Sequence, residues 1–322
     1  MKNLDQILSE ITPVLNSVEA DRQEYFRKRG NCIWFVVLPL LCFAGILTFH
    51  FFPQGLFALI PALFISGIAY HFMAGKYKQS FAENYKTCVV SRLVHEIDPN
   101  LQYNISAGIE MNAFVASELF RTHPDRYHTE DLIHGVYGET GFQLAEVNAK
   151  EKRETTDSDG KRKTTYVTIF NGLILVADFH KHFQGRTFIF PDVAEKALGG
   201  LGRTLQKMGG RHDTELIQLE DVEFEREFSV HSSDQIESRY ILSPAMMRRL
   251  IELKSKFGKD VRLAFKDSNV ILAVPHPKPY LEPNIRAPAT DPGQIESMLR
   301  EVSHFIEIIE ELDLNTRIWT KQ

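Results

Sequence analysis

The sequence predicts an α+β protein with a two-helix transmembrane hairpin, then a mainly antiparallel β cytoplasmic domain with interspersed helices and a C-terminal amphipathic helix. Three observations lead to this prediction. Residues 30–75 contain no Asp, Glu, Lys or Arg over 46 positions. Apolar and polar residues alternate from Ile133 onward, as in half-buried strands. Both ends of the chain carry apolar residues at helical spacing.

An amphipathic helix is expected ahead of the charge-free run, within residues 1–29. Its apolar residues follow one another at intervals that place them on a single helical stripe. They are Leu4, Ile7, Leu8, Ile11, Val14, Leu15 and Val18.

The run over residues 30–75 predicts the transmembrane hairpin. A helix needs about 20 mostly apolar residues to cross a bilayer, so the run accommodates two crossings, at residues 32–51 and 56–73. Pro53 and Gly55 lie in the turn between them. Small residues recur every four positions along the second crossing and favour close packing of the two helices. They are Ala58, Ala62 and Ser66.

Basic residues flank both crossings, whereas the turn has no charge. The positive-inside rule therefore places both termini and the main domain in the cytoplasm, with the hairpin in the bacterial inner membrane. The flanking residues are Arg22, Arg27, Lys28 and Arg29 on one side and Lys76, Lys78 and Lys86 on the other.

Five regions follow from these patterns. We expect an N-terminal helix (1–29), the hairpin (30–75), a helical stalk (76–130), an α+β domain (131–275), and a Pro-rich linker with a C-terminal helix (276–322).

Within the α+β domain, nine segments have the two-residue period of strands. They are residues 143–147, 164–170, 173–179, 187–190, 216–219, 227–231, 237–242, 261–265 and 270–274. Turns are expected at residues 157–160, 171–172 and 267–269, and helices at 194–208 and 244–257.

The C-terminal helix has an apolar stripe that resembles the N-terminal one. It comprises Ile295, Met298, Leu299, Val302, Phe305, Ile306 and Ile309. Matching stripes favour pairing of the two helices, within one chain or across a dimer. The alternative is that each helix packs on its own domain.

The segment EFSVHSSDQIESRYILSP, residues 227–244, resembles the signature of a bacterial membrane-anchored family catalogued as domain of unknown function 3137. Phe170-Asn171-Gly172, Asp178-Phe179 and Gly185-Arg186-Thr187 support the resemblance, which spans residues 132–283 and the hairpin arrangement. The family has no established reaction, so the resemblance implies no activity. It hints at a small membrane-anchored helical partner of the LemA type.

Four residues of this signature are candidates for binding: Asp234, Glu237, Arg239 and Tyr240. On the predicted strand, Glu237 and Arg239 share one face and could instead be structural cross-strand partners. Asp234 at the strand start also suits a turn.

Asp178, His180 and His182 form a candidate metal site. Residues at every second position of a strand point to one face, and two histidines so placed can ligate zinc beside an open position. The alternative is a strand that becomes polar as it leaves the sheet.

Arg203, Lys207 and Arg211, four residues apart, could form a basic helix edge facing anionic lipid. An ordinary amphipathic helix explains the same spacing.

Composition narrows the classes of function. A net charge of −5 argues against nucleic-acid binding, and three cysteines, Cys32, Cys42 and Cys88, offer no disulfide framework. No catalytic motif and no cofactor is predicted. We therefore expect a membrane-anchored cytoplasmic module that binds the bilayer and a protein partner or assembles as a homo-oligomer. The alternative is a membrane-bound metal-dependent hydrolase using Asp178, His180 and His182, and whether the hairpin also conducts stays open.

Overall fold

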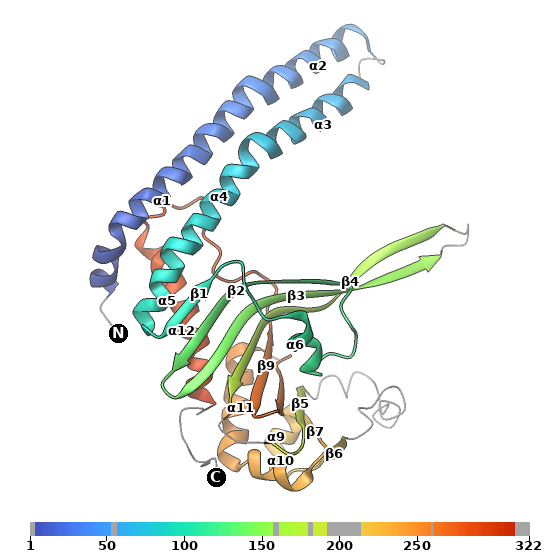
Figure 1. Ribbon diagram of the computed structural model, residues 1–322. Helices are drawn as coiled ribbons and strands as arrows, with labels where there is room; N and C mark the ends of the chain where they lie inside the picture. Colours follow the sequence, from blue (N-terminus) through green and yellow to red (C-terminus); the bar gives the residue numbers. More distant parts are fainter. Residues whose placement is uncertain are drawn as a thin grey trace. The chain divides into compact units, whose positions relative to one another are not determined.

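The computed structural model describes residues 4–52, 57–156, 161–179, 183–191, 214–258 and 260–312 (Figure 1). The chain divides into two compact units. The first comprises Met1–Glu96 and Leu281–Arg300, and the second comprises Ile97–Tyr280 and Glu301–Gln322.

The first unit is built on two long helical runs. The first run consists of α1 (Leu4–Cys32), the π-helical η1 (Ile33–Val37) and α2 (Leu38–His50). The second consists of α3 (Leu59–Tyr70), η3 (His71–Gly75), α4 (Lys76–Tyr85), η4 (Lys86–Val90) and α5 (Ser91–Ile97). Both are long and apolar enough to cross a membrane, by length and composition.

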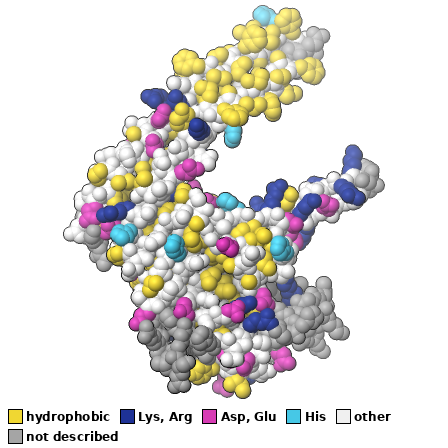
Figure 2. Space-filling view, viewed as in Figure 1, with side chains coloured by type: hydrophobic (Ala, Val, Ile, Leu, Met, Phe, Trp, Pro, Cys, Tyr) yellow, Lys and Arg dark blue, Asp and Glu magenta, His cyan; other side chains and the backbone are white. Residues whose placement is uncertain are grey.

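The apolar part of the hairpin is largely exposed, and Figure 2 shows hydrophobic side chains along the face in view. Only 11% of the most apolar window of the first run and 17% of that of the second is buried. A core helix of a water-soluble protein would be mostly covered, and a contiguous apolar surface of this size is rare on such proteins. The exposed side chains, which include Trp34, Phe49, Phe64 and Phe72, therefore indicate membrane anchoring.

Small residues lie where the two arms of the hairpin meet. Ala44 on α2 is buried, as are Ala62 and Ser66 on α3. The latter two belong to the ridge that the sequence predicts at a close helix contact.

The base of the first unit joins three stretches of chain. The apolar stripe of α1, with Ile7, Ile11 and Leu15, is buried, and α1 runs beside α4 and η4. The returning segment after Leu281 is attached by polar contacts: the Ala289 N–H donates to Glu19 at 2.7 Å, and Lys86 Nζ lies 2.5 Å from a Glu282 carboxylate oxygen. The α1 stripe thus packs within its own unit, and its pairing with the C-terminal helix stays a prediction.

The second unit contains a sheet whose described strands all pair antiparallel, in the order β1-β2-β3-β4-β9-β8-β5-β7-β6. This confirms the α+β class. The strands are β1 (Leu101–Asn104), β2 (Arg126–Tyr137), β3 (Thr140–Thr156), β4 (Arg162–Asp178), β5 (Thr187–Pro191), β6 (Glu215–Ile217), β7 (Phe228–Ser232), β8 (Arg262–Lys266) and β9 (Asn269–Pro275). The helices are α6 (Met111–Ala116), α9 (Val222–Glu227), α10 (Gln235–Ile241), α11 (Pro244–Phe257) and α12 (Pro292–Glu311), whose last eleven residues belong to this unit.

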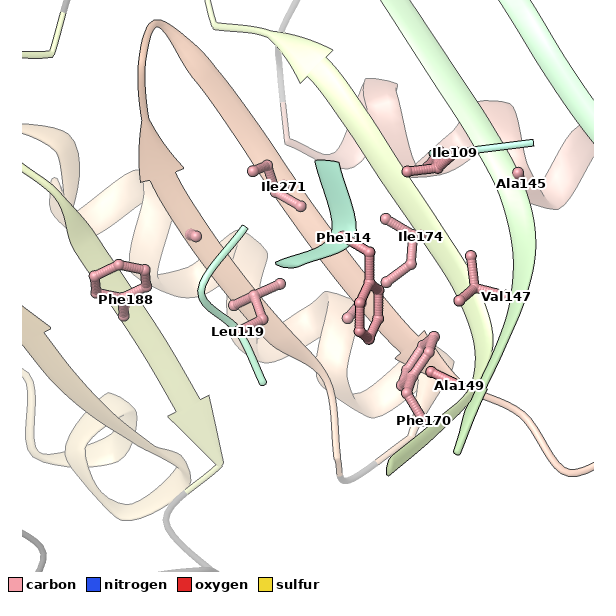
Figure 3. Packing of buried hydrophobic residues seen from close by; sticks show 12 residues of the cluster. Ile109, Phe114, Leu119, Ala145, Val147, Ala149, Phe170, Ile174, Phe188 and Ile271 are labelled. Carbon is pink, nitrogen blue, oxygen red and sulfur yellow. The ribbon is translucent and has the colours of Figure 1, made fainter. Parts of the chain in front are cut away.

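One face of the sheet packs under α6 and the turn that follows it. Phe114 of α6 and Leu119 join alternating residues of β3, β4 and β9, such as Val147 and Ile271, in a buried cluster (Figure 3). The alternating pattern arises because successive side chains of a strand point to opposite faces.

The other face is also buried, with Leu144, Leu175 and Leu272 among its residues. α11 and the end of α12 are linked to each other by the Lys256–Glu307 ion pair at 2.6 Å. α12 is linked to the end of β2 by a 2.5 Å hydrogen bond from Tyr137 Oη to Glu310.

Several expected elements differ from the structure. The stalk region expected at residues 76–130 is helical as far as Ile97 and again in α6, but it also contains β1 and the first five residues of β2. β3 and β4 run beyond the bounds of the expected strands, and their outer parts form a two-stranded arm that agrees with a long hairpin at the charged stretch 150–163. The described ends of the arm pair Thr156 with Arg162. The expected helix at residues 194–208 lies outside the described residues.

Asn171-Gly172, predicted as a turn, is internal to β4. Gly172 pairs with Val147 on one side and Pro275 on the other. It has φ +151°, and a Cβ there would lie 2.2 Å from the Val274 carbonyl oxygen. The conformational freedom of glycine is used for a close approach to β9, while the Asn171 side chain donates to the His276 carbonyl at 2.7 Å.

Gly172→Ala should therefore destabilise the protein. Strain and the clash with the β9 backbone together predict a loss of about 2 kcal/mol or more, which lowers Tm by roughly 4–8 °C for a domain of this size. Thermal unfolding of the full chain in detergent measures the shift. Gly141→Ala on β3 is the matched control, because no atom lies within 4 Å of its Cβ position. Equal Tm values for the two variants would contradict this account of Gly172.

Candidate functional site

Asp234 begins a helix, which corrects the predicted strand at residues 237–242. Asp234 Oδ1 accepts hydrogen bonds from the N–H groups of Ile236 and Glu237, both at 2.9 Å. These are the bonds of an N-cap, and they satisfy N–H groups that have no partner within the helix. The cap outweighs the apolar alternation, so residues 235–241 form α10, and Glu237 and Arg239 are not cross-strand partners.

The Glu237 carboxylate attaches α10 to the loop ahead of β5. Its Oε2 accepts from the Gly185 N–H at 2.8 Å, and its Oε1 accepts from the Gln184 N–H at 3.1 Å. A Glu at this helix position often turns back to its own N-cap. Here it binds a second segment of the chain instead.

The loop and the start of α10 approach so closely that only glycine fits at position 185. A Cβ on Gly185 would lie 2.8 Å from Asp234 Cβ and 3.0 Å from Ser233 Oγ. The Arg186 N–H donates to Ser233 Oγ at 2.9 Å, and the Ser233 N–H donates to the Arg186 carbonyl at 3.0 Å. Two separate motifs of the family signature, at residues 185–187 and 233–237, thus form one polar clamp.

Charged side chains continue this network toward α6. Glu118, in the turn after α6, accepts from Arg186 Nη1 and from Lys266 Nζ, both at 2.9 Å. Lys266 Nζ also donates to the Ala116 carbonyl at 2.8 Å. Partial burial opposes ionisation of Glu118, but the two cations outweigh it and lower the pKa of its carboxyl.

One face of α10 remains exposed. Ile236 is 85% exposed and Tyr240 is 53% exposed, and Arg239 is also exposed. Positions i, i+3 and i+4 lie side by side on a helix, so these three residues form a continuous patch, named here the α10 surface. It borders a shallow hollow lined by Asp234, Ile236, Glu237, Arg239 and Tyr240.

The four predicted binding residues therefore have different environments. Asp234 and Glu237 use their carboxylates inside the clamp, whereas Arg239 and Tyr240 face outward. The guanidinium of Arg239 also donates to the Gln218 carbonyl at 3.1 Å. Sequence reasoning missed Ile236, although Asp234 followed by Glu237 is the capping pattern that would have predicted a helix and its exposed face.

The other two candidate sites fall largely outside the described residues. Asp178 ends β4 opposite Asn269, but His180 and His182 are not described. Arg203, Lys207 and Arg211 are not described either. Among the residues that the structure does describe, no group of three or more His, Cys, Asp or Glu side chains could hold a metal ion.

Comparison with known proteins supports the family resemblance. Residues 168–314 match the model of the family described as "Protein of unknown function (DUF3137)". The chain carries a DUF3137 segment. This DUF3137 segment runs from β4 to the end of α12 and contains the clamp and the α10 surface.

Two further comparisons say less about the DUF3137 segment. No curated protein matches the chain. The crystal structure of the mycobacterial trehalose monomycolate transport factor A, TtfA, aligns with 9% identity and a TM-score of 0.33, covering 69% of this chain and 96% of that one. At that score the similarity carries no conclusion about fold or function.

Glu118 should make stability acid-sensitive. Because its pKa is lowered in the folded state, its contribution is fully present above the ordinary glutamate pKa of about 4.3 and is lost as pH falls through the folded value. Glu118→Gln should cost about 1–3 kcal/mol at pH 7, and this difference from the wild-type protein should shrink toward pH 3. Urea unfolding of the full chain from pH 7 to pH 3 measures it. Glu252→Gln, an exposed site on α11, is the control, and a pH-independent difference would contradict the assignment.

Proposed function

We propose that this protein is a membrane-anchored module whose hairpin crosses the bacterial inner membrane twice and whose cytoplasmic domain binds a protein partner through the α10 surface. The observation that supports this most is the exposure of Ile236 and Tyr240 on one face of a helix that the clamp holds rigidly. A helix held by the N-cap of Asp234 and the carboxylate of Glu237 presents its outer side chains in one arrangement. Such preorganisation reduces the entropic cost of association.

The composition of the α10 surface suits a protein partner. Binding hot spots are enriched in Tyr, Trp and Arg. Tyr240, Arg239 and Ile236 provide an aromatic ring, a cation and an aliphatic group that are neighbours on the surface of α10. A single exposed Ile would be unremarkable, but this combination on one rigid helix face is typical of a docking surface.

The orientation rests on charge and length. Exposed apolar side chains cover the hairpin from Trp34 to Met73, and the flanking basic residues are all on the side of the termini. Basic residues near the ends of membrane helices favour the cytoplasm. Both termini and the second unit are therefore assigned to that side.

Partner binding is tested by placing a photo-crosslinking amino acid at Ile236 or Tyr240 in the full chain. Cells irradiated in vivo should yield one adduct of defined mass from each position. Ser255, exposed on α11, is the matched control and should yield none. An adduct of twice the chain mass would indicate a second copy, and another mass would indicate a different protein. Equal or absent adducts at all three positions would refute the α10 surface as the binding site.

Substitution provides the energetic test. Ile236→Ala with Tyr240→Ala should weaken the purified complex by roughly 30-fold or more, as hot-spot losses of at least 2 kcal/mol do. Because both side chains are exposed, Tm should change little. Unchanged affinity in the double variant would remove these side chains from the interface.

Topology is tested with single cysteines in a chain whose Cys32, Cys42 and Cys88 are replaced by Ala. Phe52→Cys lies by the hairpin turn, and Thr155→Cys lies on the β3–β4 arm. In intact cells, a membrane-impermeant thiol reagent should label only the first, and permeabilised cells should allow labelling of both. Labelling of Thr155→Cys in intact cells would reverse the orientation.

A further inference from the structure

We propose that a basic collar at the base of the hairpin binds the headgroups of anionic phospholipids. The collar comprises Arg27, Lys28 and Arg29 on α1 and Lys76 and Lys78 on α4. This inference rests on the proposed membrane anchoring and specifies the lipid class that surrounds the anchor. Figure 2 shows Lys and Arg side chains where the hydrophobic surface of the hairpin ends.

The collar lies at headgroup depth. Trp34 is 70% exposed and marks the start of the apolar surface on the first run. Arg29 precedes Trp34 by five positions, and at 1.5 Å per residue this is about 8 Å along the helix. On the second run, Lys76 follows Met73 by three residues, about 5 Å. The polar zone on each side of the hydrocarbon core is roughly 5–8 Å thick, so Arg29, Lys76 and Lys78 fall within it. Lys28 and Arg27 begin about 9–11 Å from Trp34, and their long side chains can extend to this zone.

Most of this positive charge is available. Arg27 pairs with Glu24 at 3.3 Å, but its side chain remains 68% exposed. Lys76 and Lys78 are exposed, and among the described residues neither forms an ion pair. In contrast, Arg22 and Lys86 are engaged by Glu19 and Glu282 within the first unit.

Neighbouring rings limit the freedom of two collar residues. Lys28 Nζ lies 5.3 Å from the centre of the Tyr77 ring on the other helical run. The Arg29 guanidinium lies 6.0 Å from the centre of the Phe26 ring. Cations over aromatic faces are attracted by the ring, so the collar is partly ordered before any lipid binds.

Position favours a lipid over a soluble acidic protein. The charges lie on α1 and α4, which continue into the two arms of the hairpin, at the level where the apolar surface begins. Anionic headgroups surround both helices at that depth, whereas a protein would have to displace them first. Juxtamembrane basic residues attract acidic lipid with an energy that adds up over the cluster.

Trp34 provides a direct readout, because it is one of only two tryptophans. The full chain with Trp319→Phe is reconstituted in bilayers of phosphatidylcholine and phosphatidylglycerol at a fixed ratio of about three to one. Two samples are prepared: in one the phosphatidylcholine is brominated, and in the other the phosphatidylglycerol is brominated. The ratio of the two lipids is therefore the same in both samples. Quenching of Trp34 by each brominated lipid then gives the composition of its immediate surroundings.

We expect phosphatidylglycerol to be enriched about threefold around Trp34 at low salt, and the enrichment to fall toward one at 0.5 M NaCl, because exposed charges are screened. Arg27→Gln combined with Lys76→Gln and Lys78→Gln should remove most of it. Lys76→Arg with Lys78→Arg should keep it. Lys161→Gln with Lys163→Gln, on the β3–β4 arm, is the matched control and should also keep it.

Equal quenching by the two brominated lipids around the wild-type collar would overturn the proposal. Enrichment that survives the collar substitutions but not the arm substitutions would also overturn it. Failure of both brominated lipids to quench Trp34 would be a different result, because it would show that the hairpin is not in the bilayer and would refute the anchoring itself.

Discussion

The Glu237 carboxylate joins the far end of the sheet to the helix that carries the proposed binding surface. Through its bonds to the Gln184 and Gly185 N–H groups, α10 is attached to the start of β5, and β5 lies between β8 and β7. Arg186 extends the attachment to Glu118. The Glu237 carboxylate thus links α10, which carries Ile236 and Tyr240, to β5, and Arg186 links the same loop to the turn after α6.

Within residues 234–240, the side chains that hold α10 in place are different from those that are exposed. Asp234 and Glu237 are conspicuous in the sequence because they are charged, yet both are used internally. The side chains of Ile236, Arg239 and Tyr240 are exposed instead. Polar residues in a family signature can therefore fix the position of a surface helix without themselves contacting a ligand.

Elements governed by local pattern could be predicted, and those governed by competing or distant contacts could not. The hairpin and the C-terminal helix follow from composition and period, and the turn between β8 and β9 follows from Asp267 and Ser268, which adopt positive φ. α10 was missed because an N-cap overrode alternation. Gly172 was misread because its role depends on β9, about a hundred residues later. Of the α10 surface, the sequence predicts Arg239 and Tyr240 as binding candidates, and it does not predict Ile236.

The first unit is formed by two segments that are far apart in the sequence, and they are therefore synthesised at different times. At its base, Glu282 pairs with Lys86, and the Ala289 N–H donates to Glu19. Along the chain, the residues of each pair are separated by all the strands of the sheet. At about 5–20 residues per second, a ribosome needs roughly 10–40 seconds to travel from Glu96 to Leu281. During that time the base of the first unit stays incomplete, because Glu282 and Ala289 have not yet been synthesised.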